Sequence, residues 1–198
     1  MIVPLGRWVL ETACEQASRW QELAPQAAPF VSVNLAVRQA QEPGLVDDVA
    51  RVLDRTGLDP RCLQLELTES AIMDPGQEPL AALTTLSAMG VRIAIDDFGT
   101  GYSNLAYLRS LPVHVLKLAG SFVDGLRTAG RADPVGERII GTLVQLAHAL
   151  GLTVTAEGVE TEAQAQRLKS MRCDAGQGWY FAPAGTAEEL TRLLTRYT

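Results

Sequence analysis

The chain has 198 residues, of which 47% are hydrophobic and 20% are charged, as is usual for a soluble globular protein. It has 23 acidic and 17 basic residues and no cluster of Lys or Arg, which argues against binding of long nucleic acid. No apolar run approaches the roughly 18–20 residues that a membrane helix requires, and the three separated cysteines favour a reduced, cytoplasmic location.

Segments with helical periodicity recur along the chain. The first is residues 1–21, where the apolar side chains predict a helix that buries Trp8, Val9, Ala13 and Trp20. A second helix is predicted at residues 137–150, and a last one at residues 187–198. Thr186 and Glu189 resemble a capping box that opens this last helix.

Short segments rich in Val, Ile and Leu alternate with these helices. Such alternation implies a mostly parallel sheet, which is either an open doubly wound sheet or most of an eight-stranded barrel. The periodicity does not choose between the two. The predicted strands are residues 30–35, 63–69, 91–97, 113–118, 152–157 and, least regular, 173–181.

Polar side chains gather at the carboxyl ends of these strands, although strands of a parallel sheet should be almost wholly apolar. Active sites of barrel and doubly wound enzymes lie at that edge. Period-two alternation also places Glu66, Asp96 and Glu157 on the face of the small residues, away from the leucines and isoleucines. The polar residues concerned are Asn34, Glu66, Glu69, Asp96, Asp97, Lys117, Glu157 and Gln177.

Crowded carboxylates cannot all ionise without a nearby cation. Asparagine and carboxylate oxygens suit Mg²⁺ or Mn²⁺, and no cluster of His or Cys indicates zinc. The adjacent pair Asp96 and Asp97 fits a two-metal site, and Lys117 could orient a water or neutralise a phosphate. Glu69 and Asp97 could instead cap helices or loops. The residues alone therefore indicate a magnesium-dependent enzyme on a parallel α/β scaffold and leave the substrate open.

Six segments resemble motifs of one known family, in the family's order. They are Val-Pro-Leu-Gly-Arg-Trp-Val-Leu at 3–10, Ser-Val-Asn-Leu at 32–35, Glu-Leu-Thr-Glu at 66–69, Asp-Asp-Phe-Gly-Thr-Gly-Tyr-Ser at 96–103, Ala-Glu-Gly-Val-Glu-Thr at 156–161 and Gln-Gly-Trp-Tyr-Phe-Ala-Pro at 177–183. Together these motifs resemble the EAL family of cyclic-di-GMP phosphodiesterases. The resemblance implies a TIM-like (β/α) barrel of the EAL type, of which the chain holds about six of eight strands.

The resemblance further implies hydrolysis of cyclic di-GMP to linear pGpG by two Mg²⁺ or Mn²⁺ ions. Lys117 would hold the attacking water, Glu69 would brace the loop at residues 97–103, and Gln177 would sit beside the site. The implied metal contacts are Asn34, Glu66, Asp96 and Glu157, with Asp97 on the second ion.

Members of the family commonly dimerise near the loop at residues 97–103, and they often carry a GGDEF (diguanylate-cyclase-like) or sensor domain. A homodimer through that loop and an upstream domain of this kind are therefore expected here. The chain is expected to be a single partial EAL domain over residues 1–198.

Two departures from the family pattern affect the expected activity. The Glu-Ala-Leu strand should precede residues 3–10 by a few tens of residues, so the first two strands and one glutamate ligand are expected to be missing. Ala119 stands where the family usually has aspartate after Lys117 and Leu118. Weak or no turnover is therefore expected. The alternatives are a degenerate domain that binds cyclic di-GMP or a protein partner, and an unrelated metal-dependent barrel enzyme.

Overall fold

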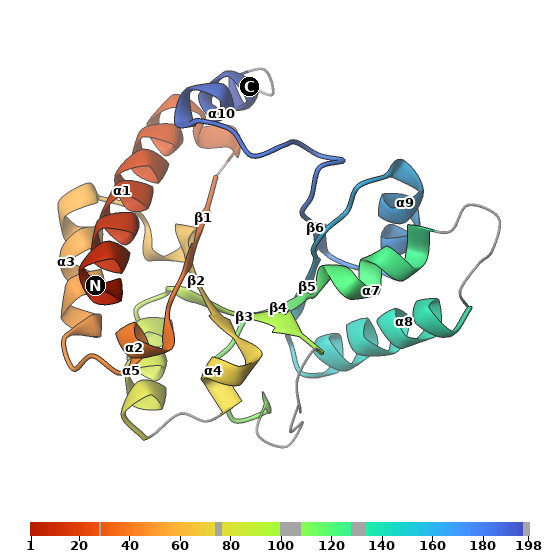
Figure 1. The fold of residues 1–198 in the computed structure, drawn as a ribbon. Helices are drawn as coiled ribbons and strands as arrows, with labels where there is room; N and C mark the ends of the chain where they lie inside the picture. Colours follow the sequence, from red (N-terminus) through yellow and green to blue (C-terminus); the bar gives the residue numbers. More distant parts are fainter. Residues whose placement is uncertain (28, 74–76, 100–107, 128–133, 196–198) are drawn as a thin grey trace. The chain divides into compact units, whose positions relative to one another are not determined.

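The computed structural model describes every residue except 28, 74–76, 100–107, 128–133 and 196–198 (Figure 1). No helix in the described part is long and apolar enough to cross a membrane. The chain divides into two compact units. The N-terminal unit comprises Met1–Leu67, Asp74–Ile93 and Gly185–Thr198, and the C-terminal unit comprises Thr68–Met73 and Ala94–Ala184.

The N-terminal unit packs helices on a pair of parallel strands. β1 (Val31–Asn34) pairs in parallel with β2 (Leu63–Thr68). α1 (Ile2–Leu23) packs on β1 and lies beside α3 (Leu45–Thr56), as Figure 1 shows. The remaining elements are the helices α2 (Val37–Ala40), α5 (Gln77–Ala88) and α10 (Ala187–Leu194) and the 3-10 turns Pro25–Ala27 and Pro60–Cys62.

The buried side of α1 differs from the predicted one. Trp8 is 60% exposed and Val9 is 38% exposed, so the prediction that they are buried is wrong. The buried residues of the helix are instead Gly6, Leu10, Cys14 and Ala17. Three of these four are small. The helix therefore approaches its neighbours through small side chains, which a search for large apolar residues overlooks.

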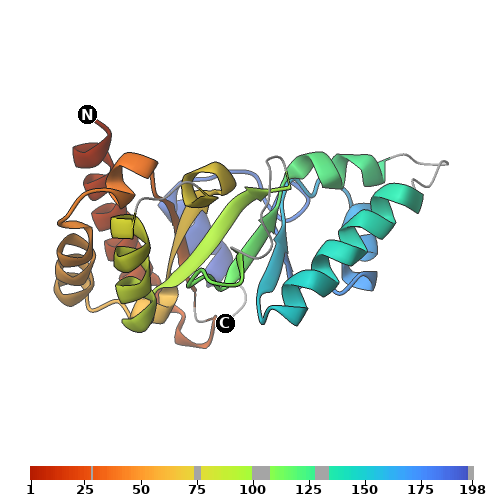
Figure 2. The ribbon, with the colours of Figure 1, turned by 90° about the horizontal axis from the view of Figure 1, so that it is seen from below.

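The strands of the C-terminal unit also pair in parallel. From Ala94 on, β3 (Arg92–Phe98) pairs with β4 (Val115–Leu118), then β5 (Thr153–Ala156) and β6 (Ala175–Gly176) follow. α8 (Pro134–Ala149) runs along β5 (Figure 2) and buries Ile140, Val144 and Ala147. Helical spacing also places Ile139 on this face, but Ile139 is 44% exposed. The remaining elements are α4 (Glu69–Met73), α7 (Gly120–Asp124), α9 (Glu162–Ser170) and the 3-10 turn Gly125–Arg127.

Each predicted strand is present, but the last is much shorter than residues 173–181. Only Ala175–Gly176 form a strand, because the backbone beyond them turns back on itself. The Phe181 N–H donates to the Gly178 carbonyl, and the Tyr180 N–H donates to the carbonyl of Val159 in the loop after β5. The parallel α/β class is confirmed, and so is the capping box of Thr186 and Glu189 at the start of α10.

Candidate metal and catalytic site

In the N-terminal unit, two predicted ligands lie side by side at the strand ends. Asn34 of β1 is the register partner of Glu66 of β2, so both side chains project from one face of the pair. The Glu66 side chain is buried at 6% exposure, and its Oε1 accepts a hydrogen bond of 3.0 Å from Gln64 Nε2. Gln64 also donates to Ser32 Oγ at 3.0 Å. This row of polar groups keeps the Glu66 carboxylate in a fixed position.

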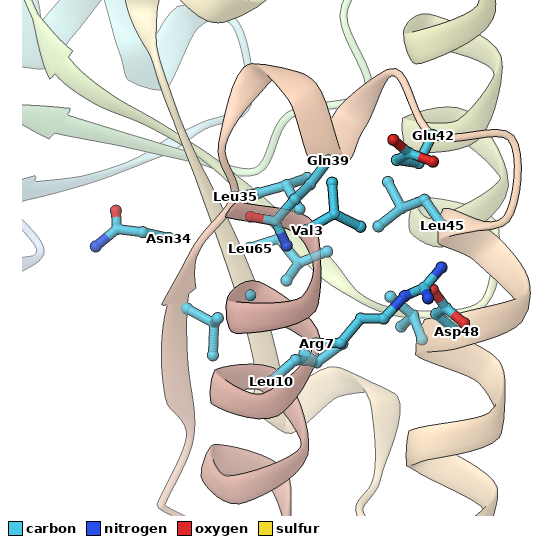
Figure 3. Close-up of a pocket in the computed structure, with 13 residues that line it drawn as sticks. Val3, Arg7, Leu10, Asn34, Leu35, Gln39, Glu42, Leu45, Asp48 and Leu65 are labelled. Carbon is cyan, nitrogen blue, oxygen red and sulfur yellow. The ribbon is translucent and has the colours of Figure 1, made fainter. Parts of the chain in front are cut away.

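A cavity lies on the helix side of β1, where Asn34 points away from the other labelled side chains (Figure 3). Its walls come from α1, α2, α3, β1 and β2 and are mostly apolar. An ion pair of 2.5 Å between Arg7 Nε and Asp48 Oδ2 borders it. Apart from Asn34, no predicted site residue lines this cavity, so it is separate from the candidate site.

In the C-terminal unit, Lys117 links two predicted acids. Its Nζ lies 2.9 Å from Asp96 Oδ1 and 2.7 Å from Glu157 Oε1. The lysine side chain is only 5% exposed, and the two carboxylates are 17% and 21% exposed. A charge buried this deeply requires partners. One ammonium between two carboxylates still leaves a net negative charge, so the cluster attracts a further cation.

A β-bulge separates the two consecutive aspartates. Ile95 pairs with Leu116 and Phe98 with Leu118, so β3 carries one residue more than β4 between these pairs. Asp97 takes a positive φ of 53° there, a conformation that aspartate tolerates better than most residues. Bulges are frequent next to active sites because they re-aim side chains. Here the bulge leaves Asp96 beside Lys117 and Asp97 exposed.

Glu69 contacts the turn that follows these aspartates. Its side chain is buried at 2% exposure, and its Oε2 accepts a hydrogen bond of 2.9 Å from the Gly99 N–H. Gly99 has a φ of +93°, and a Cβ at this position would lie 2.6 Å from the Phe122 ring. The turn is therefore held from two sides. Residues 100–103 of the predicted loop lie outside the described residues.

Gln177 and Ala119 flank Glu157. The Gln177 N–H donates to the Ala156 carbonyl at 2.8 Å, and its own carbonyl accepts from the Val159 N–H at 3.0 Å. The buried Ala119 is the N-cap residue of α7 and makes no side-chain cap. Because an aspartate at this position could cap the helix, Ala119 removes both a cap and an acid from the strand end.

The donor set fits magnesium or manganese in its chemistry, because every predicted ligand offers a hard oxygen. Within the described residues, however, no three His, Cys, Asp or Glu side chains are grouped so that they could hold one ion. Asn34 and Glu66 belong to the N-terminal unit, whereas Asp96, Asp97 and Glu157 belong to the C-terminal unit. Lys117 lies between Asp96 and Glu157. Convergence of these ligands on shared ions remains a prediction.

Sequence reasoning missed three residues that support these side chains. Gln64 holds Glu66, Phe122 packs on Gly99, and Gln164 contacts the loop after Glu157. Gln64 could have been found, because it is a polar residue in the middle of an apolar strand. Nothing in the sequence pattern distinguishes Phe122 from an ordinary core residue.

Comparison with known proteins gives a consistent picture. The sequence model of the family described as EAL domain matches residues 1–184. An uncharacterized protein of Mycobacterium tuberculosis is 45% identical over 184 residues, which cover 93% of this chain and 60% of the relative. The bifunctional diguanylate cyclase/cyclic di-GMP phosphodiesterase MucR of Pseudomonas aeruginosa is 42% identical over 190 residues, 96% of this chain and 27% of MucR.

Solved structures of similar proteins share the fold. The MucR phosphodiesterase in complex with c-di-GMP has a TM-score of 0.87 at 42% identity and covers 96% of this chain and 74% of that one. The EAL domain of Mycobacterium smegmatis DcpA has a TM-score of 0.90 at 38% identity. The match covers 99% of this chain and 86% of the DcpA chain. The manganese/cy-diGMP complex of Klebsiella pneumoniae BlrP1 has a TM-score of 0.72 at 26% identity. The match covers 88% of this chain and 44% of the BlrP1 chain. The predicted fold class is thereby confirmed.

Proposed function

The chain belongs to the EAL domain family, and from this premise we propose that it hydrolyses cyclic di-GMP to linear pGpG with two divalent cations, Mg²⁺ or Mn²⁺. The observation that carries the proposal is the position of the Lys117 ammonium, 2.9 Å from Asp96 and 2.7 Å from Glu157. Support also comes from MucR, which was solved with c-di-GMP, and from BlrP1, which was solved with manganese and cy-diGMP.

The strand-end oxygens are the proposed metal ligands. Asn34 and Glu66 from one unit and Asp96 and Glu157 from the other would hold one ion, with Asp97 on the second. Divalent cations bound there would lower the pKa of a water and stabilise negative charge on the phosphate. The buried hydrogen bond from Gln64 and the bulge at Asp97 would pre-set the ligands for this purpose.

Lys117 is the proposed holder of the attacking water. Two carboxylates fix its ammonium, and this group would donate to the water oxygen as that oxygen adds to phosphorus. The water gives up one proton to the solvent as one P–O ester bond breaks, and the leaving sugar oxygen takes up a proton from the solvent, so that the hydrolysis balances. Glu69 would keep the acidic turn in place through the Gly99 N–H, and Gln177 would sit beside Glu157.

A second candidate function is binding of cyclic di-GMP or of a protein partner without hydrolysis. It is favoured by Ala119, which replaces the family's usual aspartate beside the lysine strand. The loss of an acid at this point would weaken the cluster's attraction for cations while leaving the fold intact.

The setting of the domain is also a proposal. The chain spans 60% of the length of its Mycobacterium relative and 27% of MucR, a bifunctional diguanylate cyclase and phosphodiesterase. These lengths support an arrangement in which the domain works beside a GGDEF or sensor domain. We further propose a cytoplasmic location and a homodimer through the loop at residues 97–103.

A hydrolysis assay with Mn²⁺ separates the two candidate functions. Formation of pGpG, measured by chromatography, should be weak with this chain and should disappear in Lys117→Met. If calorimetry shows that cyclic di-GMP binds but is recovered intact, the binding function replaces the catalytic one. If the chain neither binds nor cleaves it, hydrolysis and binding of cyclic di-GMP both fail, and only binding of a protein partner is left.

A further inference from the structure

Gln164 is a completely buried amide that the site described so far leaves unexplained. Its relative exposure is 0%. Its Oε1 accepts hydrogen bonds from the Glu160 N–H at 2.8 Å, the Thr161 N–H at 2.9 Å and Thr161 Oγ1 at 3.1 Å. Together with Thr161 it forms the capping box that starts α9. A capping box uses only the oxygen of such a side chain, so the helix start does not explain the amide nitrogen.

The amide nitrogen reaches a different part of the unit. Gln164 Nε2 donates to the carbonyl of Val123 at 3.1 Å, 41 positions away in the sequence. Val123 belongs to α7. This helix begins at Gly120, directly after Ala119, which follows the strand β4 that carries Lys117. Gln164 therefore ties the loop that follows Glu157 to the helix that follows Lys117.

α7 also touches both acidic turns through its other residues. A Cβ on Gly158, which has a φ of +69°, would lie 3.2 Å from the Cα of Gly120 in α7. The Phe122 ring of the same helix packs on Gly99 in the turn after Asp97. The helix thus contacts the chain on either side of the Lys117 cluster.

Glu157 needs such support, because it lies just beyond the regular pairing of β4 and β5. The last register pair is Leu118 with Ala156, and the Glu157 N–H still donates to the Leu118 carbonyl at 3.1 Å. Past this bond the Val159 N–H ties the loop to Gln177 at 3.0 Å, and Gln164 ties it to α7, while the Glu157 carboxylate meets Lys117 at 2.7 Å. We infer that Gln164 is a positioning residue that sets Glu157 against Lys117 by anchoring this loop to α7.

The inference is separable from the catalytic proposal, although its consequence for metal binding rests on that proposed function. Displacement of Glu157 should open the ion pairs of Lys117 whether or not metal is present. It should also weaken Mn²⁺ binding, because small displacements of a catalytic or ligand group are costly.

The test uses the fact that the chain contains only two lysines, Lys117 and Lys169. Labelling with ¹⁵N-lysine gives two ammonium groups. The one at Lys117 is buried in ion pairs that slow its proton exchange, and the exposed one at Lys169 serves as an internal reference. Lys117→Met assigns the signal. A Mn²⁺ titration followed by electron paramagnetic resonance gives the second readout.

Gln164→Met removes both the oxygen and the nitrogen of the amide. It should abolish the slowly exchanging Lys117 ammonium signal and weaken Mn²⁺ binding by about tenfold or more. The matched control is Thr161→Ala, which removes the capping hydroxyl but keeps the contact between Gln164 and Val123. It should lower the melting temperature while leaving both readouts unchanged. Should Gln164→Met not fold, Gln164→Glu at pH 8 retains the acceptor oxygen, loses the donor to Val123, and should give the same two losses.

A Gln164 variant that folds, melts at a lower temperature and keeps the Lys117 signal of the wild type would overturn the inference, since the residue would then serve only stability. If the wild-type chain binds no Mn²⁺, the catalytic proposal fails on its own, and the ammonium signal still decides the role of Gln164.

Discussion

The two units carry acidic strand ends that are built in different ways. In the N-terminal unit, Asn34 and Glu66 extend from regular strands in register, and a neutral amide from Gln64 steadies the glutamate. In the C-terminal unit, Asp96 and Glu157 share a buried ammonium, and a bulge sends Asp97 in another direction. Regular strand geometry therefore suffices to present one pair of proposed ligands, whereas the other pair requires irregular backbone.

This difference teaches where the molecule is vulnerable. A regular strand end depends on many equivalent hydrogen bonds, so the loss of one neighbour has a limited effect. The C-terminal cluster depends on single side chains and on turns with positive φ at Asp97, Gly99 and Gly158. Substitutions of the same kind should therefore lower the free energy of unfolding by different amounts in the two units.

The largest effect is expected at Lys117. Lys117→Met should lower the free energy of unfolding by about 3–5 kcal/mol, because it strands two partly buried carboxylates. Urea denaturation at pH 7 measures this. A loss below about 1 kcal/mol, the value typical of exposed ion pairs, would show that water already screens the cluster.

The next effect separates two glycines that both have positive φ. Gly99→Ala should cost about 2–4 kcal/mol, because the methyl group combines backbone strain with a clash on Phe122. Gly57→Ala is the control in the N-terminal unit: Gly57 has a φ of +67° but no heavy atom within 4 Å of the added Cβ. It should cost about 1–2 kcal/mol. Equal losses in thermal or urea unfolding would remove the special role of the acidic turn.

Gln64→Leu tests the N-terminal strand end itself. The change deprives the buried Glu66 carboxylate and Ser32 of a donor, and should lower stability by about 1–3 kcal/mol. It should therefore be milder than Lys117→Met under the same conditions. A larger loss than that of the lysine variant would reverse the proposed contrast between the units.

The smallest effects concern two carboxylates outside the site. In the N-terminal unit, the hydrogen bonds from the Arg61 side chain and backbone lower the pKa of Asp59 to about 2. In the C-terminal unit, burial acts to raise the pKa of Asp174, but hydrogen bonds from His148 and the Val154 N–H outweigh it and hold the pKa below its ordinary value. Depressed carboxyl pKa values stabilise the folded chain above about pH 4, and this contribution is lost as the pH falls through the folded-state pKa.

Asp59→Asn and Asp174→Asn should each cost less than about 1 kcal/mol at pH 7, because both side chains are more than a third exposed. Each variant should approach the wild type in stability as the pH falls, for Asp59 near pH 2. Urea denaturation across this pH range, at low and high salt, measures the difference. If the difference in stability between variant and wild type grew towards acid pH, the predicted direction of the pH dependence would be wrong.

Most of the fold follows from local pattern. Short segments rich in Val, Ile and Leu located the strands, and helical periodicity identified most of the buried side of α8, although Ile139 is exposed. It failed for α1, where small residues form the packed face, and for the segment after β6, whose backbone bonds to the loop after β5. Both failures arise from neighbours that are distant in the sequence.

The candidate site was predictable in its residue types but not in its geometry. Acids at strand ends indicated Glu66, Asp96 and Glu157 because parallel strands end at one edge. The bulge at Asp97 depends on the register between β3 and β4, and the role of Gln164 depends on its contact with α7. Neither the register of β3 and β4 nor the contact of Gln164 with α7 leaves a periodic pattern in the sequence.

The most direct test of the shared metal site is a crystal structure of the chain grown with Mn²⁺, with data collected for anomalous scattering. The proposal predicts anomalous peaks bonded to oxygens of Asn34, Glu66, Asp96 and Glu157, so that both units contribute to one ion. If manganese is absent there, or is bound by the residues of one unit alone, the proposed convergence of the two strand ends is wrong.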